Sequence, residues 1–234
     1  MNNSLKHELA GLIHAVPSAG RLLYRAAYGP FGPYLAYAWP IPGWLGRSEG
    51  LVLAQRCYDL PANAVVVEIG SFLGKSAVMF AGARRLQGSG VVHCIDPFDA
   101  SGDAFSVPVY QSIADKSGLS LRQRFDANIA RAGLTDWVRV HQGTAASVAT
   151  SWTQPIDLLF LDGDQSPEGA QLAYRLWIPF LKVGGIIAVH NSTERVYDPS
   201  HVGNRLLAQN TIRPPQFGEI VSVDITTVAR KLLA

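Results

Sequence analysis

The residues best suited to chemistry lie between Val65 and Ser76, where three valines lead into the run Glu68-Ile-Gly-Ser-Phe-Leu-Gly-Lys-Ser. The apolar run predicts a buried strand and the residues from Ser76 onward predict a helix, with Gly70 and Gly74 in the turn between them. A helix N-terminus carries unpaired N–H groups and a partial positive charge, so it favours a ligand with a carboxylate or a phosphate. We therefore expect an anionic group of a ligand above this turn.

Two common phosphate-binding loops do not fit the turn. A P-loop has four residues between its first glycine and Gly-Lys-Ser, whereas only three separate Gly70 from Gly74. The dinucleotide fingerprint G-x-G-x-x-G is absent as well, because Phe72 stands where its second glycine belongs. Glu68 would also bring a carboxylate close to any phosphate. A phosphate chain is therefore disfavoured, and an ordinary strand-turn-helix connection whose glycines serve only geometry stays an alternative.

Polar or small residues follow each of the other predicted strands that could lie beside this turn. They are Asp96, Gly143 with Thr144, Asp162, and His190 with Asn191. In a doubly wound sheet, ligands bind in the crevice beyond the carboxyl ends of the strands. We therefore expect these side chains to converge on one site.

Strands and helices alternate along the chain in the way that such a sheet requires. We expect strands at 64–69, 91–96, 137–141, 157–161 and 186–189, helices at 75–86, 119–132, 167–181 and 200–209, and two final strands at 219–223 and 225–230. The first five strands are mostly apolar, which indicates a parallel sheet covered on both faces. The last two are joined by almost no loop and must be antiparallel. The pattern predicts an α/β fold with a doubly wound, mostly parallel seven-stranded sheet and an antiparallel edge strand.

The first 47 residues form a separate N-terminal arm, which precedes a domain that spans residues 48–234. We expect helices at 4–15 and 19–27, then an irregular stretch at 28–44 that is rich in aromatic residues, proline and glycine. This stretch is too apolar for a solvated linker. It packs on the domain or on a second copy of the chain, or it forms a wall of the substrate pocket.

Composition excludes several classes of protein. Hydrophobic residues make up 48% of the 234 residues and charged residues 16%, which favours a folded core over disorder. The net charge of +2, without a run of lysine or arginine, argues against nucleic-acid binding. No apolar run reaches the roughly 18 residues of a membrane span. Two cysteines without metal-ligand spacing indicate buried thiols, and we expect a cytoplasmic protein.

The motif Glu68-x-Gly-x-x-x-Gly-x-Ser resembles the first motif of class I S-adenosylmethionine-dependent methyltransferases, which have a Rossmann-like fold. Two further stretches, 159–169 and 181–191, are similar to a bacterial subgroup related to the catechol-type enzymes. Its members include O-methyltransferases that modify small natural products. The resemblance covers about residues 48–231 and implies a transferase that methylates a small-molecule hydroxyl.

The resemblance also implies where the cofactor, S-adenosylmethionine, binds. A carboxylate at the position of Asp96 can accept both ribose hydroxyls, with a helix or turn cap as its alternative role, and Thr144 and Ala145 resemble the segment that flanks the adenine. The remaining positions implied to contact the cofactor are Glu68, Gly70, Ser71, Phe72, Ser76 and Asp162. Acceptor selection would fall to residues 28–45, 97–118 and 192–200.

At the reacting end, relatives often hold a divalent cation with positions that match Asp162, His190 and Asn191. His190 is also the best matched candidate for a neutral-pH base oriented by Asp162, because Gln165 stands where relatives place a base. We interpret His201 as a surface group. Because His190 and Gln165 depart from the pattern, a methyltransferase-like binding or assembly protein without catalysis is the alternative function.

Overall fold

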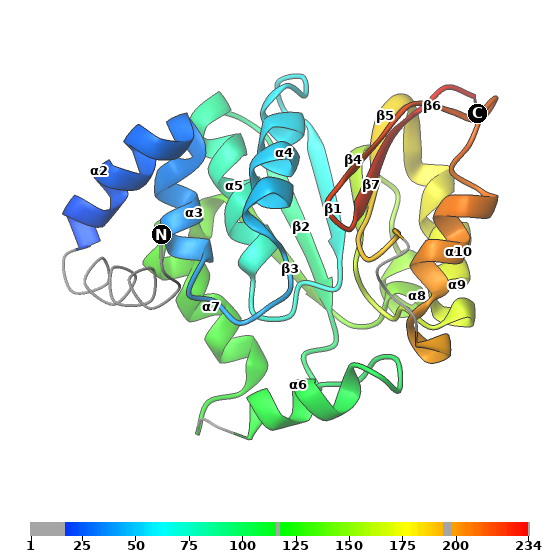
Figure 1. The fold of residues 1–234 in the computed structure, drawn as a ribbon, viewed down its shortest axis with the longest axis horizontal. Coiled ribbons are helices and arrows are strands. Elements are labelled where there is room, and N and C mark those ends of the chain that lie inside the picture. Colours follow the sequence, from blue (N-terminus) through cyan, green and yellow to red (C-terminus); the bar gives the residue numbers. More distant parts are fainter. Residues whose placement is uncertain (1–16, 116–117, 194–197, 234) are drawn as a thin grey trace.

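A computed structural model describes residues 17–115, 118–193 and 198–233 (Figure 1). The helix expected at 4–15 lies outside these residues. A seven-stranded sheet forms the centre, in the order β3-β2-β1-β4-β5-β7-β6. Its strands are β1 Val65–Ile69, β2 Val91–Asp96, β3 Val138–Gln142, β4 Ile156–Leu161, β5 Leu181–Val189, β6 Phe217–Val223 and β7 Thr226–Lys231.

The first five strands are parallel, whereas β7 runs antiparallel to both β5 and β6. The predicted fold class is therefore confirmed, with β6 as the edge and β7 as the antiparallel strand next to it. β5 begins at Leu181, several residues earlier than expected, because α9 ends at Trp177 and a 3-10 turn at Ile178–Phe180 follows. Pro179 in that turn has no N–H to continue the helix.

Helices cover both faces of the sheet (Figure 1). On one face lie α4 Arg47–Tyr58, α5 Lys75–Gln87 and α7 Leu121–Arg131, and on the other α8 Ala145–Ala149, α9 Pro167–Trp177 and α10 Gly203–Asn210. Alternate strand residues serve the two layers: Leu158 and Phe160 join the first core cluster, and Leu159 and Leu161 join the second. This period of two explains the almost unbroken apolar strands of the sequence.

The N-terminal segment is more regular than the sequence suggested. The helix expected at 19–27 is present as α2 Pro17–Tyr28, but residues 29–38 form a 3-10 turn, Gly29–Phe31, and the helix α3 Gly32–Ala38. Pro33 stands at the start of α3, where the missing N–H costs nothing. Leu35 and Ala38 are buried, and the ring of Tyr34 lies over Gly82 of α5, where a Cβ atom would come within 2.3 Å of Tyr34 Cγ. This stretch therefore packs on the same chain.

One further helix, α6 Val107–Ala114, lies in the segment after β2 and has no counterpart in the sequence prediction. In Figure 1 it lies at the bottom, near the ends of the strands, and its C-terminal end contacts α7, where Arg124 donates to the Ile113 carbonyl (2.7 Å). Cys57 and Cys94 are both free and buried. In the described part of the chain, no helix has the length and apolar character needed to cross a membrane.

Candidate functional site

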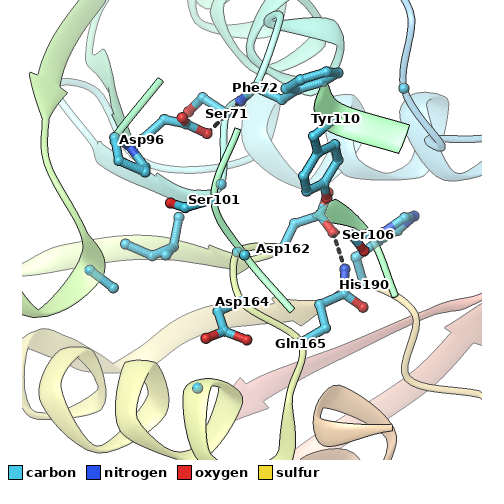
Figure 2. A pocket seen from close by; sticks show the side chains of 18 of the residues that line it. Ser71, Phe72, Asp96, Ser101, Ser106, Tyr110, Asp162, Asp164, Gln165 and His190 are labelled. Atoms are coloured by element: carbon cyan, nitrogen blue, oxygen red, sulfur yellow. Dashed lines mark hydrogen bonds and ion pairs between the residues drawn. The ribbon is translucent and has the colours of Figure 1, made fainter. Parts of the chain in front are cut away.

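A cavity of about 960 Å³ opens beyond the carboxyl ends of the strands (Figure 2). The predicted convergence is confirmed, since residues from the ends of β1, β2, β3, β4 and β5 line this one space. The predicted site residues on its wall are Gly70, Ser71, Phe72, Ser76, Asp96, Thr144, Ala145, Asp162, His190 and Asn191. Such a volume is near the upper end of the range for small-molecule sites, about 300–1,000 Å³.

The turn after β1 depends on glycine for a close approach of two main chains. Gly70 has φ +90°, and a Cβ atom there would lie 2.3 Å from the carbonyl oxygen of Asp162. The Asp162 N–H donates to the Ile69 carbonyl (2.9 Å). Gly74, with φ +88°, then begins α5, whose N-terminal end faces the cavity. The turn therefore brings the start of a helix and the end of β4 to the same place.

Asp96 is held at the end of β2 by two main-chain amides. Its Oδ2 accepts from the Phe72 N–H (2.8 Å) and its Oδ1 from the Phe98 N–H (2.7 Å). Burial raises the pKa of the Asp96 carboxyl, and these amide bonds oppose the rise without cancelling it. Each carboxylate oxygen keeps capacity for a second hydrogen bond. The carboxylate is thus oriented in advance and can still accept from a ligand.

Glu68 does not line the cavity, which corrects the prediction that it contacts a ligand. The strand alternation turns its side chain toward α5, where it is fully buried and accepts a hydrogen bond from the Ser76 hydroxyl. Burial raises the pKa of Glu68 to about 7, against the lowering effect of the Ser71 and Ser76 hydroxyls. Glu68 therefore supports the turn from beneath, and Ser76 lies between it and the cavity.

Thr144 begins α8 beside the end of β3. Its hydroxyl oxygen accepts from the Ser147 N–H (3.1 Å), and the neighbouring Gly143 N–H donates to the Asp96 carbonyl (3.0 Å). The Thr144 side chain is thus a helix cap, which fixes the wall that Thr144 and Ala145 form.

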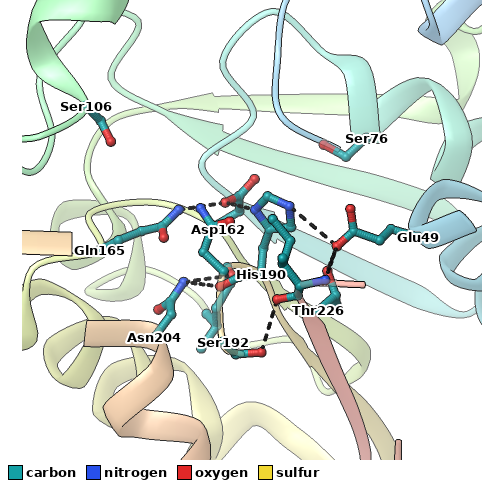
Figure 3. A network of polar contacts seen from close by, with 12 residues as sticks. Glu49, Ser76, Ser106, Asp162, Gln165, His190, Ser192, Asn204 and Thr226 are labelled. Atoms are coloured by element: carbon teal, nitrogen blue, oxygen red, sulfur yellow. Dashed lines mark hydrogen bonds and ion pairs between the residues drawn. The ribbon is translucent and has the colours of Figure 1, made fainter. Parts of the chain in front are cut away.

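Asp162 and His190 meet as predicted (Figure 3). Asp162 Oδ1 lies 2.8 Å from His190 Nδ1 and accepts from the Gln165 amide (2.9 Å). The side chain of Asp162 is 22% exposed, whereas that of His190 is 1% exposed. Asp162 is therefore the more exposed member of the pair, and both contacts use Oδ1.

The other nitrogen of His190 faces a second carboxylate, which the sequence did not single out. Nε2 lies 3.7 Å from Oε1 of Glu49, a residue of α4 that is 2% exposed. Burial lowers the pKa of His190, but the Asp162 and Glu49 carboxylates outweigh it and the net shift is upward. The predicted role of His190 as a base in contact with the acceptor does not match this geometry, because both ring nitrogens face carboxylates of the protein.

Asn191 belongs to a different polar contact. It has φ +50°, and its side-chain amide lies 3.1 Å from Nε2 of His201. His201 is 5% exposed and its Nδ1 pairs with Asp103 Oδ1 at 3.1 Å, so its interpretation as a surface group was wrong. The aromatic ring of Phe105 also packs on His201, with the ring centroids 4.9 Å apart. These contacts join the segment before α6 to the segment before α10.

The three predicted metal donors are not arranged as a magnesium site. Asp162 Oδ1 is bonded to His190 and Gln165, while the Asn191 amide is turned to His201. Only one of the three donors is a carboxylate, whereas magnesium prefers several oxygen ligands. Within the described ranges, no three His, Cys, Asp or Glu side chains are grouped in a way that could hold a metal ion. The donor set fits a hydrogen-bonded His–Asp pair instead.

An aromatic cluster closes the cavity on the side of the N-terminal segment and α6. Its members are Trp44, Phe72 and Tyr110, whose ring centroids are 5.0–6.2 Å apart. Trp44 is 50% exposed, and Lys75 Nζ donates to the Gly43 carbonyl (3.0 Å) beside it. Burial and then the charge of Asp162 raise the pKa of Tyr110. Parts of all three segments expected to select the acceptor line the cavity, including Trp44, Tyr110 and Asp198.

The sequence missed Glu49 and His201, whereas Trp44 lies in the stretch 28–45 that was expected to help select the acceptor. Glu49 is three residues after Gly46 and accepts its N–H (2.8 Å), so the local pattern predicts only a helix cap. His201 had no signal beyond the composition of its segment. Glu49 and His201 take their places through the packing of elements that lie far apart in the sequence.

A family model described as a methyltransferase domain matches residues 67–192, more than half of the chain. Solved structures share the whole fold. Rv0187 from MTB, solved with its cofactor bound, has a TM-score of 0.63 at 20% identity over 92% of this chain and 96% of that one.

An O-methyltransferase from Bacillus cereus, in complex with SAH, has a TM-score of 0.62 at 17% identity over 91% of this chain and 97% of its own. TomG of Streptomyces achromogenes, an O-methyltransferase involved in tomaymycin synthesis and solved with SAM, has a TM-score of 0.59 at 17% identity. The match covers 85% of this chain and 89% of TomG. Identities of this size support the shared fold, and the family match supports the resemblance found in the sequence.

Proposed function

The chain belongs to the methyltransferase-domain family, and we propose that it transfers a methyl group from S-adenosylmethionine to a hydroxyl of a small molecule. The observation that carries the proposal is the cavity itself, where the glycine turn, Asp96 and Asp162 line one continuous wall. The solved relatives described above that carry SAM or SAH have the same fold and include O-methyltransferases.

We assign the side of the cavity near the turn to the cofactor. The N-terminal end of α5 favours the carboxylate of the methionine part, and Asp96 accepts the two ribose hydroxyls through its free lone pairs. Thr144 and Ala145 flank the adenine, while Ser71, Phe72 and Ser76 line the path between. Glu68 acts indirectly by holding Ser76.

The acceptor then lies between Asp162 and the aromatic cluster of Trp44, Phe72 and Tyr110. The acceptor oxygen attacks the methyl carbon in line, the carbon–sulfur bond breaks, and S-adenosylhomocysteine leaves as a neutral thioether. The hydroxyl proton passes to Oδ2 of Asp162, because the contacts with His190 and Gln165 both use Oδ1 and the Asp162 residue lines the cavity. Alignment of the two reactants and exclusion of water supply the rest of the catalysis. Divalent-cation assistance is not part of the proposal, because the donor set is not that of a magnesium site and its side chains bond to other residues.

Calorimetry with S-adenosylhomocysteine, followed by mass spectrometry of turnover with a panel of phenolic, catecholic and sugar hydroxyls, tests the proposal. We expect binding and at least one product that is heavier by one methylene. Binding without any product would favour the alternative of a binding or assembly protein, and no binding would contradict both. Association through residues 1–47 and a cytoplasmic location stay predictions, and sedimentation of the full chain checks the first.

A further inference from the structure

The imidazole of His190 lies between two carboxylates. Its Nδ1 is 2.8 Å from Asp162 Oδ1 and its Nε2 is 3.7 Å from Glu49 Oε1 (Figure 3). A neutral imidazole has one N–H and one lone pair, so one of its nitrogens would turn a lone pair toward a negative oxygen. The imidazolium form has an N–H at both nitrogens, so each nitrogen turns a positively polarised hydrogen toward one of the two carboxylates. The geometry therefore favours a positive charge at this position.

Glu49 is fixed in place by groups that donate to it. Its Oε2 accepts from the Gly46 N–H (2.8 Å), and its Oε1 accepts from the Thr226 hydroxyl (2.6 Å) and the Ile225 N–H (3.3 Å). These partners come from the start of α4 and from the β6–β7 connection and β7. Since Glu49 is also 2% exposed, its carboxylate cannot turn to water.

The Nε2 atom of His190 is buried and lacks a hydrogen-bond partner among the described residues. A buried polar atom without a partner requires a compensating interaction, because an unmet hydrogen bond destabilises the folded protein by about 1–3 kcal/mol. The Glu49 oxygen is beyond hydrogen-bond distance but within the range of an ion pair. A charge–charge contact is therefore the interaction that compensates Nε2.

We propose that Glu49 is a positioning residue that keeps His190 in the imidazolium form, so that a buried positive charge holds Asp162 at the reacting end of the cavity. This inference rests on the proposed function. It makes His190 a fixed charge rather than a base, and it agrees with a donor set that is not that of a magnesium site. Glu49 itself does not line the cavity and acts through His190.

The direction of the pKa shift supports this arrangement. Burial disfavours the charged imidazole, and the two carboxylates overcome that effect. The charged groups that face His190 are Asp162 from the end of β4 and Glu49 from α4. The Phe160 ring, with its centroid 6.1 Å from that of His190, and the Asn204 amide, which donates to the His190 carbonyl (2.8 Å), add no charge.

The direct test is an NMR titration of the full-length protein with ¹⁵N-labelled histidine, in which the His190→Gln variant identifies the signal. We expect His190 to be protonated at pH 7 and Glu49→Gln to weaken its proton affinity by about tenfold or more, one pH unit. Glu49→Asp keeps the charge and should recover part of the affinity. A neutral His190 in the wild-type protein at pH 7, or a titration that Glu49→Gln leaves unchanged, would overturn the proposal.

This titration needs no turnover, so its failure is separate from a failure of the proposed function. With an acceptor in hand, the alkaline limit of kcat should move to lower pH in Glu49→Gln and return toward the wild-type value in Glu49→Asp. A merely structural role for Glu49 would lower activity equally at every pH. If Glu49→Gln does not fold, the wild-type titration alone decides the charge of His190.

Discussion

The two sides of the cavity are built in different ways. The turn side, formed by residues 70–74 and Asp96, takes its shape from main-chain atoms: Gly70 passes beside the Asp162 carbonyl, and two amides hold the Asp96 carboxylate. The Asp162 side takes its shape from side chains of distant elements, such as Glu49 of α4 and Tyr110 of α6. The comparison suggests that the proposed cofactor site is fixed by local geometry, while the proposed acceptor site depends on tertiary packing.

The largest effect should come from Gly70→Ala. The added Cβ atom would meet the main chain of Asp162 at 2.3 Å and the residue would keep a φ of +90°. We expect a loss of at least about 3 kcal/mol in the free energy of unfolding, measured with urea, together with the loss of cofactor binding. Gly88→Ala is the matched control, because it has φ +88° with no atom within 4 Å and should cost only about 1–2 kcal/mol. Equal losses in the two variants would contradict the role of close approach.

Asp96→Ala tests the turn side by removing the carboxylate, and it also takes the acceptor away from the Phe72 and Phe98 N–H groups, so the fold of the variant is checked first by circular dichroism. The loss of two hydrogen bonds to ribose should weaken S-adenosylhomocysteine binding by about 30- to 1000-fold, or about 2–4 kcal/mol. Calorimetry checks this, with Asp99→Ala as the control, since Asp99 is exposed on the same loop and its side chain accepts from the Ser101 N–H (2.9 Å). Unchanged affinity in Asp96→Ala would remove the ribose assignment.

Asp162→Asn should separate the two sides. The amide keeps the size of the side chain but cannot take a proton, so we expect kcat to fall at least ~100-fold while the cofactor dissociation constant stays within about threefold. Asp164→Asn, at an exposed carboxylate on the same cavity wall, is the control and should retain most activity. Near-normal turnover in Asp162→Asn would show that another group receives the proton.

Trp44→Ala should act on the acceptor alone. Trp44 comes from the N-terminal segment and contacts the rings of Phe72 and Tyr110. Removal of this aromatic wall should raise the acceptor KM by about 3- to 30-fold, since one aromatic contact contributes about 0.5–1.5 kcal/mol beyond the area that it buries. Steady-state kinetics checks the change, with Leu86→Ala on the exposed face of α5 as the control. A rise in the cofactor KM instead would place Trp44 on the turn side.

The sequence predicted the turn side better than the Asp162 side, and the reason is physical. Gly70, Asp96 and Thr144 stand at strand ends, so the order of the strands alone brings them together. The strand alternation that faces Glu68 away from the cavity was available in the sequence, yet its acidic character suggested a ligand contact. Glu49 and His201 join the site only through the packing of α4, β7 and the segment before α6, which no local pattern encodes.

The smallest effect is expected on removal of divalent metal, which should leave turnover unchanged. If a metal ion were held by Asp162, His190 and Asn191, EDTA would abolish turnover and added magnesium or manganese would restore it. In the structure the Asp162 and His190 side chains bond to each other and Asn191 contacts His201, and in the arrangement that we propose the positive charge near Asp162 is that of His190. We expect kcat to change by less than about twofold after dialysis against EDTA, because no step of the proposed reaction depends on the ion.

The Asn191→Ala variant sharpens the test. If Asn191 were a metal ligand, the variant would lose activity and a higher concentration of added metal would restore part of it. If Asn191 is a partner of His201, the variant should have a changed acceptor KM and the same response to EDTA as the wild-type protein. Metal-dependent turnover in the wild-type protein would mean that Asp162 and His190 separate to bind the ion, and it would remove the imidazolium from the mechanism.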